Sequence, residues 1–110
     1  MTNWLRRGDV WWVDFDPSIG TEIQKTRPAV IVSNDQANRA LSRFQVVPLT
    51  TNLKKFYAGN ALVMISGRKS RAMADQLFTA DRERFGRQLG RLSEEDILAV
   101  DDAIRVQLAL

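Results

Sequence analysis

The chain has 110 residues and is 45% hydrophobic, which suits one globular domain with a single core and excludes a disordered protein. It contains neither cysteine nor histidine, which excludes disulfide and thiolate chemistry and argues against a zinc site, so we expect no metal and no cofactor. The formal net charge is +3, and no stretch approaches the roughly 20 apolar residues of a membrane span, so we expect a cytoplasmic protein without a membrane partner.

The first half of the chain predicts strands and one short helix. Strands are expected where β-branched and aromatic residues are concentrated, over residues 8–15, 29–32 and 44–49. A polar segment, residues 18–26, separates the first two strands and predicts a mobile surface loop. Arg27-Pro28 leads from this loop into an apolar run, which predicts a strand buried on both faces. Residues 33–35 are typical of a helix cap, so a helix is expected over residues 36–41.

The second half predicts further strands and a C-terminal helix. The strands are expected over residues 61–65, 72–78 and 88–92, with a polar turn over residues 66–70. Ser93 begins a capping box with Asp96, so a helix should begin there. Three- and four-residue spacing then predicts an apolar stripe that packs on the sheet, formed by Ile97, Val100, Ile104 and Leu108, with Asp101, Asp102 and Arg105 toward water. Short strands followed by one helix indicate a small, mainly β antiparallel barrel with a C-terminal helix.

Positive charge is concentrated in the body of the chain. Residues 1–92 hold 15 basic and 8 acidic residues, a net charge of +7, whereas residues 93–110 hold 1 basic and 5 acidic residues, a net charge of −4. Arginine accounts for 12 of the 16 basic residues, and its guanidinium can bind a phosphate through two parallel hydrogen bonds. The charge therefore suits either a nucleic-acid partner or a surface that is merely well solvated.

Arg27 and Thr50 are candidates for RNA cleavage without a metal. The neighbouring 2′-hydroxyl can attack the phosphorus if one group takes its proton, another stabilises the phosphorane and a third protonates the leaving 5′-oxygen. Arg27 stands where the polar loop meets a buried strand, so its guanidinium can hold a phosphate; the alternative is an ion pair with a loop acid such as Glu22. Thr50 ends a strand, where its hydroxyl can bond either a phosphate oxygen or local backbone.

Four further residues are candidates for RNA binding. Asp75 and Gln76 lie within the predicted strand over residues 72–78, where a carboxylate needs a specific partner, either an arginine of this chain or an RNA base. Lys54 and Lys55 lie in a predicted loop. They either flank an electropositive groove for the RNA backbone or are simply solvated, and the same holds for basic residues near the later turn, Arg68, Lys69 and Arg71.

Six segments taken together resemble the MazF/PemK toxin family. They are Gly8-Asp9-Val10-Trp11, Asp14-Phe15-Asp16-Pro17, Gly20-Thr21-Glu22, the run from Arg27 to Asn34, Val47-Pro48-Leu49-Thr50 and Asp75-Gln76. No single segment is specific, but their order covers nearly the whole chain. The resemblance implies a single toxin domain over residues 1–110 with the CcdB/PemK-like fold, an SH3-like barrel, in a homodimer.

The resemblance also implies an activity and a partner. The expected activity is metal-independent cleavage of single-stranded RNA at short sequences, which leaves 2′,3′-cyclic phosphate and 5′-hydroxyl ends and so inhibits translation and growth. The expected partner is a MazE-like antitoxin whose acidic tail covers a basic groove, with DNA contacted only through that antitoxin.

Family positions can be carried over residue by residue. The catalytic arginine of the family matches Arg27, its catalytic threonine matches Thr50, and a loop acid matches Glu22, a candidate general base. Asp75-Gln76 matches a frequent Asp-Gln pair near the substrate groove. Some relatives carry an arginine and a histidine where this chain has Met73 and Thr21, so mechanisms that use those groups do not carry over.

Two other functions suit the same expected fold. One is a CcdB-like poison of DNA gyrase, although this chain ends in Leu108-Ala109-Leu110 and lacks the tryptophan near the C-terminus on which such poisons rely. The other is a non-catalytic nucleic-acid-binding barrel, which would bind RNA without cutting it.

Overall fold

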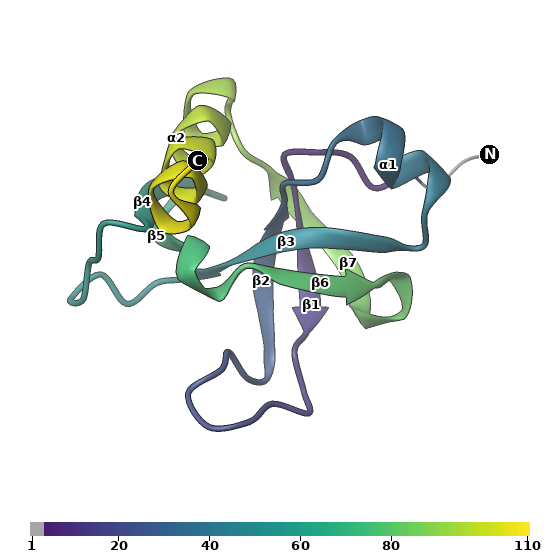
Figure 1. The fold of residues 1–110 in the computed structure, drawn as a ribbon, viewed down its shortest axis with the longest axis horizontal. Coiled ribbons are helices and arrows are strands. Elements are labelled where there is room, and N and C mark those ends of the chain that lie inside the picture. The colour runs from purple at the N-terminus through teal and green to yellow at the C-terminus, as the bar shows by residue number, and fades with distance from the viewer. Residues whose placement is uncertain (1–3) are drawn as a thin grey trace.

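Seven strands form one curved antiparallel sheet in the computed structural model, which describes residues 4–110 (Figure 1). In chain order they are β1 (Asp9–Asp14), β2 (Thr26–Ile31), β3 (Arg43–Thr50), β4 (Asn60–Ile65), β5 (Arg68–Met73), β6 (Phe78–Asp81) and β7 (Phe85–Arg91). The order across the sheet is β4-β5-β3-β2-β1-β7, and β6 pairs with β3 off this path. The prediction of a small, mainly β antiparallel barrel with a C-terminal helix is confirmed, with the sheet curled into a half-barrel.

β3 organises the sheet because three strands pair with it. β2 pairs through Ala29 opposite Pro48, while β6 pairs with the beginning of β3 from Arg43. β5 pairs with the end of β3 and places Arg71 opposite Thr50. β3 thus connects the β4–β5 hairpin to the rest of the sheet, and its last residue, Thr50, lies where β3 pairs with β5.

The core lies on both faces of the central strands. On β2, Val30 packs into the apolar cluster beneath the C-terminal helix, whereas Ala29 and Ile31 pack into a second cluster with Val13 and Phe44. The predicted burial of this strand on both faces is therefore confirmed. A strand held in this way is a rigid base for the residues at its exposed end.

Two strand predictions were wrong in their bounds. Residues 72–78 do not form one strand, because β5 ends at Met73 and a 3-10 turn, η1 (Ala74–Gln76), separates it from β6. β5 and β6 pair with different parts of β3, so the chain must turn between them. Asp75 consequently lies in an exposed turn and not in a buried strand. The last strand is longer than predicted, and a further 3-10 turn, η2 (Arg82–Arg84), precedes it.

Both predicted helices are present. α1 (Asp35–Ala40) is capped by Asn34, and α2 (Glu94–Leu108) is capped by Ser93, whose hydroxyl accepts the backbone N–H of Asp96 at 3.1 Å. Ile97 and Val100 are buried, but the stripe does not extend to Leu108, which is 50% exposed. Asp101 does not face water as predicted, since it forms an ion pair with Arg7. No helix in the described part of the chain is both long and apolar enough to cross a membrane.

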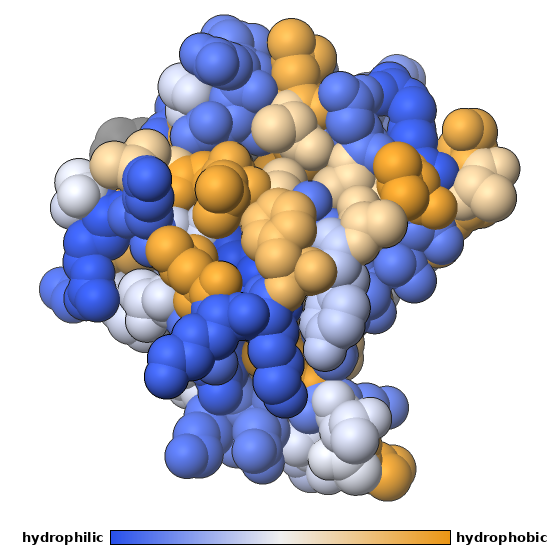
Figure 2. All heavy atoms as spheres, turned by 90° about the vertical axis from the view of Figure 1, so that its left-hand side faces the viewer, coloured by the Kyte–Doolittle hydropathy of each residue, from blue (hydrophilic) through white to orange (hydrophobic). Residues whose placement is uncertain are grey.

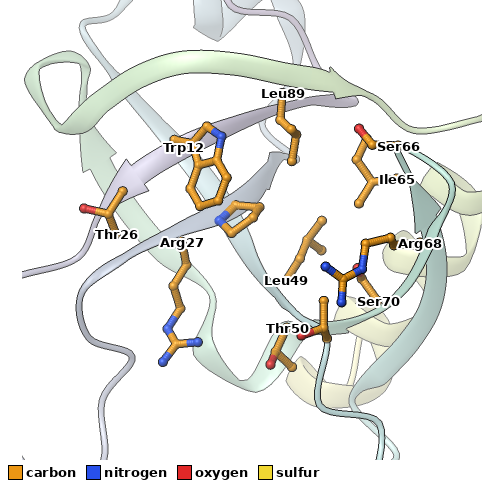
Figure 3. Close-up of a pocket in the computed structure, with 12 residues that line it drawn as sticks. Trp12, Thr26, Arg27, Leu49, Thr50, Ile65, Ser66, Arg68, Ser70 and Leu89 are labelled. Atoms are coloured by element: carbon orange, nitrogen blue, oxygen red, sulfur yellow. The ribbon is translucent and has the colours of Figure 1, made fainter.

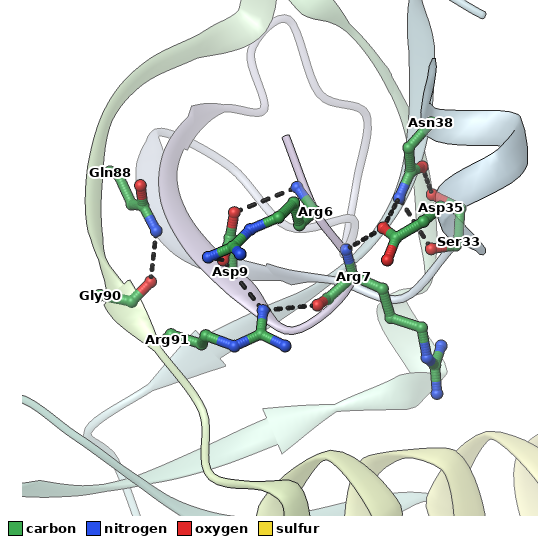
Figure 4. Close-up of polar contacts among 9 residues, drawn as sticks. All are labelled: Arg6, Arg7, Asp9, Ser33, Asp35, Asn38, Gln88, Gly90 and Arg91. Atoms are coloured by element: carbon green, nitrogen blue, oxygen red, sulfur yellow. Dashed lines mark hydrogen bonds and ion pairs between the residues drawn. The ribbon is translucent and has the colours of Figure 1, made fainter. Parts of the chain in front are cut away.

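Polar contacts fix the start of β1 (Figure 4). Asp9 is 1% exposed, and its carboxylate accepts the backbone N–H of Arg6 at 3.0 Å and lies 3.1 Å from Nη1 of Arg91. The backbone N–H of Arg7 donates to Oδ1 of Asp35 at 2.8 Å. This hydrogen bond lowers the pKa of Asp35, because it stabilises the charged carboxylate. The N-terminal segment is thereby tied to β7 and α1.

Candidate active site

A pocket of about 380 Å³ opens beside the end of β3 (Figure 3). Its apolar lining comes from Trp12, Pro28, Leu49, Ile65 and Leu89, and its polar lining from Thr26, Arg27, Thr50, Thr51, Ser66, Arg68 and Ser70. In the close-up, the guanidinium groups of Arg27 and Arg68 lie on either side of Thr50. The pocket therefore offers two cations and several hydroxyls around an apolar floor.

Arg27 is the second residue of β2, directly after the β1–β2 loop. Its Nε donates to the backbone oxygen of Gln24 at 2.9 Å, which fixes the orientation of the guanidinium plane. Within residues 4–110, its Nη1 and Nη2 make no hydrogen bond, and Arg27 forms no ion pair with Glu22. Two nitrogens of a fixed guanidinium are thus left to bind an anion.

Thr50 is the last residue of β3 and is half-buried. Its Oγ1 accepts the backbone N–H of Asn52 at 3.2 Å. A hydroxyl that accepts one hydrogen bond still has its own proton to donate. The structure therefore brings the two predicted catalytic residues, Arg27 and Thr50, into one pocket. The Nη hydrogens of Arg27 and the hydroxyl proton of Thr50 remain able to donate hydrogen bonds there.

Glu22 is not brought to this pocket. The β1–β2 loop extends below the sheet in Figure 1, and the exposed carboxylate of Glu22 accepts the backbone N–H of Ile19 at 2.8 Å. Gln76 holds the same loop: its Oε1 accepts the N–H of Ile23 at 3.0 Å, and its Nε2 donates to the oxygen of Thr21 at 3.3 Å. Both polar atoms of this predicted RNA-binding residue are engaged by the chain itself.

Lys54 and Lys55 lie in the β3–β4 loop, residues 51–59, and are exposed outside the pocket. The loop lies on the left-hand side of the molecule in Figure 1. Figure 2 shows this side, where hydrophobic side chains are mixed with hydrophilic ones. The exposed large apolar residues of this loop and of β4 are Leu53, Phe56, Tyr57, Leu62 and Met64. Basic and apolar side chains are thus exposed together in the loop that follows Thr50.

Within residues 4–110, Asp75 does not form the predicted ion pair with an arginine, and Arg71 is buried, contrary to prediction. The carboxylate of Asp75 accepts Nδ2 of Asn60 at 3.1 Å and forms no ion pair among the residues that the structure covers. Arg71 is 6% exposed, so it does not flank a solvated groove as expected. It is connected to Asp75 through Asn60, because Nη1 of Arg71 donates to Oδ1 of Asn60 at 2.9 Å.

The β4–β5 hairpin contributes to the pocket: Arg68, one of the basic residues predicted to flank a groove, lines it, whereas Ser66 and Ser70 were not predicted there. Ser66 and Gly67 have φ angles of 52° and 77°, which makes a two-residue turn shorter than the predicted one. Ser66, Arg68 and Ser70 reach the pocket from this hairpin. The Ser66-Gly67 pair next to a predicted strand was the available signal for this tight turn. Within residues 4–110, no three histidine, cysteine, aspartate or glutamate residues are grouped closely enough to hold a metal ion.

Comparison with known proteins identifies the family. A family model described as PemK-like, MazF-like toxin of type II toxin-antitoxin system matches residues 6–108. Endoribonuclease MazF9 of Mycobacterium tuberculosis is 36% identical over 115 residues, which cover 96% of this chain and 98% of that protein. The crystal structure of MazF from Deinococcus radiodurans has a TM-score of 0.87 at 23% identity and covers 99% of this chain and 100% of its own. A mycobacterial endoribonuclease in complex with its cognate antitoxin has a TM-score of 0.81 at 23% identity and covers 96% of each chain. The chain therefore belongs to the family of PemK-like, MazF-like toxins of type II toxin-antitoxin systems.

Proposed function

We propose that the pocket lined by Arg27 and Thr50 is the site at which this toxin cleaves single-stranded RNA, at short sequences and without a metal ion. The chain is an endoribonuclease toxin, as its family and its curated relatives are. One observation carries the assignment of the site: a fixed guanidinium with two unused nitrogens shares a pocket with a hydroxyl whose proton is unused. Both kinds of donor stabilise the negative charge that builds on the phosphate oxygens during cleavage.

The proposed reaction uses the RNA as its own nucleophile. The 2′-oxygen forms a bond to the adjacent phosphorus, the bond from phosphorus to the 5′-oxygen breaks, and the products are a 2′,3′-cyclic phosphate and a 5′-hydroxyl. Arg27 binds the non-bridging oxygens of the phosphorane and gives a proton to the leaving 5′-oxygen, which it regains from water. Thr50 donates its hydroxyl proton to a non-bridging oxygen and holds the phosphate in place.

A general base must take the proton of the 2′-hydroxyl. Glu22 can do so only if the β1–β2 loop closes over bound RNA, because its carboxylate is bonded within that loop and lies outside the pocket. The exposed ammonium groups of Lys54 and Lys55 bind the phosphates of the RNA backbone that flank the cleavage site. The contacts that engage Asp75 and Gln76 within the chain support structural roles near the site in place of base contacts.

Two protein partners belong to the proposal. A structural relative is a complex with its cognate antitoxin, which supports a MazE-like antitoxin here. An acidic antitoxin segment would find complementary charge on a body with a net charge of +7 over residues 1–92. The exposed apolar side chains of the face in Figure 2 support a homodimer, since a group of such side chains marks a contact surface more often than single ones do. The toxin would act in the cytoplasm, where messenger RNA is translated.

The proposal is tested with the purified chain and a long unpaired transcript in EDTA. We expect cleavage, with cyclic phosphate at the new 3′ ends, and its loss in Arg27→Ala. The matched control is Arg87→Ala, which removes an exposed arginine of β7 that does not line the pocket. An Arg27→Ala protein that melts like the parent and cuts at the parental rate would remove the assignment. Binding without cleavage would indicate a passive RNA-binding barrel, and inhibition in a parallel gyrase assay would indicate a gyrase poison.

A further inference from the structure

Arg71 is a buried cation that the proposed reaction does not use. It lies on β5, opposite Thr50 in the register of β3 and β5. No carboxylate lies within 4.0 Å of its nitrogens among residues 4–110, so its charge is held by hydrogen bonds alone. Burying a guanidinium without an ion pair is costly, and such a group persists where its geometry is needed.

The hydrogen bonds of Arg71 converge on the two ends of the β3–β4 loop. At the start of the loop, Nε donates to the backbone oxygen of Asn52 at 3.0 Å. At the end of the loop, Nη1 donates to Oδ1 of Asn60 at 2.9 Å, and the same oxygen accepts the backbone N–H of Tyr57 at 3.1 Å. Asn60 is itself buried and donates to Asp75 at 3.1 Å. One side chain therefore fixes both ends of the loop that follows Thr50.

Asn52 links Arg71 to the phosphate-binding hydroxyl of Thr50. Its carbonyl is held by Arg71, and its N–H donates to Oγ1 of Thr50 at 3.2 Å. This N–H occupies one acceptor site of the hydroxyl, so the hydroxyl proton is directed away from Asn52. Without the grip of Arg71 on its carbonyl, the exposed Asn52 would be free to turn, and the hydroxyl of Thr50 would lose its fixed direction.

We propose that Arg71 is a positioning residue for the RNA cleavage reaction: by holding Asn52, it orients the Thr50 hydroxyl toward the phosphate. The inference rests on the proposed function, because it takes Thr50 to contact the scissile phosphate. Asp75 then forms the far end of the same network, through Asn60, and does not read an RNA base. Arg71 itself touches no substrate.

The test compares single-turnover cleavage with binding. The probe is a labelled single-stranded RNA oligonucleotide containing a site that the parent protein cuts, and binding is measured with the same oligonucleotide carrying 2′-deoxyribose at the scissile position. Arg71→Lys keeps the charge, but one ammonium cannot reproduce the divergent Nε and Nη1 bonds. We expect a rate about 10- to 100-fold lower, the effect of a small displacement of a reacting group, with an unchanged Kd. The control Arg43→Lys, an exposed arginine at the other end of β3, should cleave like the parent.

A second comparison separates positioning of Thr50 from general damage. If Arg71 acts through Thr50, its substitution should have little effect once the Thr50 hydroxyl has been removed. The double variant Arg71→Lys/Thr50→Val should therefore cleave no more than about 2-fold more slowly than Thr50→Val alone. The same full loss in both backgrounds, or a loss found only in Kd, would overturn the inference. Parental cleavage by Arg71→Lys, with Thr50→Val inactive, would overturn the inference alone. Parental cleavage by Thr50→Val, or no cleavage by the parent protein, would overturn the proposed function as well.

Asp75→Ala keeps the inference testable if Arg71→Lys does not fold. Asp75 is exposed, and among residues 4–110 its side chain hydrogen-bonds to Asn60 alone, so its removal takes away the acceptor of Asn60. We expect a lower single-turnover rate, an unchanged Kd and an unchanged choice of cut sites. A weaker Kd or altered cut sites would mean that Asp75 contacts RNA, and that outcome contradicts the network.

Discussion

Gln76→Ala should release the β1–β2 loop without unfolding the protein. The side chain makes one half-buried hydrogen bond at 3.0 Å to Ile23 and one exposed hydrogen bond at 3.3 Å to Thr21. A net contribution of about 0.5 to 1.5 kcal/mol for each bond, taken toward the lower end for the exposed one, gives about 1 to 2 kcal/mol for opening the loop. The open population should therefore rise about 5- to 30-fold.

Limited trypsin digestion measures this population. Lys25 lies in the loop, whereas Arg27 precedes a proline and resists trypsin, so cleavage after Lys25 reports loop opening. At low protease concentration the rate follows the open population. We expect it to rise by the same factor in Gln76→Ala, together with amide exchange at Ile23. Cleavage after the remote Lys54 or Lys55 serves as the internal reference.

The matched control is Gln88→Ala, whose side chain donates to the oxygen of Gly90 at 3.1 Å, far from the loop in the chain. Equal rates of cleavage after Lys25 in Gln76→Ala and Gln88→Ala would refute the reasoning that the hydrogen bonds of Gln76 hold the β1–β2 loop closed. In that case the loop is held by its own internal bonds, such as that between Glu22 and Ile19.

Three further predictions concern other parts of the molecule. Charge reversal at Lys54 and Lys55 should weaken binding to all unpaired RNA sequences alike. The slope of log Kd against log salt concentration should fall by about one for each lost phosphate contact, and an unchanged slope would mean that these lysines do not contact RNA. Ser93→Ala removes the cap of α2 and should cost about 1 kcal/mol in urea unfolding, with an unchanged m-value. The pKa of Asp35 is lowered in the folded state by the N–H of Arg7, so its stabilisation is present above the ordinary aspartate pKa and is lost as pH falls through the folded pKa. Acid should therefore reduce the unfolding free energy of Asp35→Ala less than that of the parent.

Local chemistry made much of the fold predictable. The capping box at Ser93 placed α2 correctly, because the hydroxyl and the amide that it binds lie within one turn of the chain. The apolar run after Arg27-Pro28 placed a strand buried on both faces. The strand patterns alone did not predict that Arg27 and Thr50 lie near each other. That prediction came only from the resemblance to a family. The structure supplies the independent observation that both line one pocket.

The break between β5 and β6 was not predictable from local pattern. Residues 72–78 are mostly apolar, and nothing in them signals a turn. The turn arises because β5 and β6 pair with different parts of β3, which is a property of the whole sheet. Arg71 was misjudged for the same reason. As one basic residue among several in a polar stretch it suggested a surface, whereas its burial depends on partners 11 and 19 residues away.

The unpredicted turn η1 carries Asp75 and Gln76, whose side chains connect to two different loops. Gln76 bonds the β1–β2 loop, which carries Glu22, and Asp75 connects through Asn60 and Arg71 to the loop that follows Thr50. A continuous strand would have pointed these two side chains to opposite faces of the sheet. The turn instead lets adjacent residues reach two loops that are far apart in sequence. One three-residue segment thus holds the β1–β2 loop directly and connects to the β3–β4 loop through Asn60, so a substitution in η1 should alter cleavage through these loops.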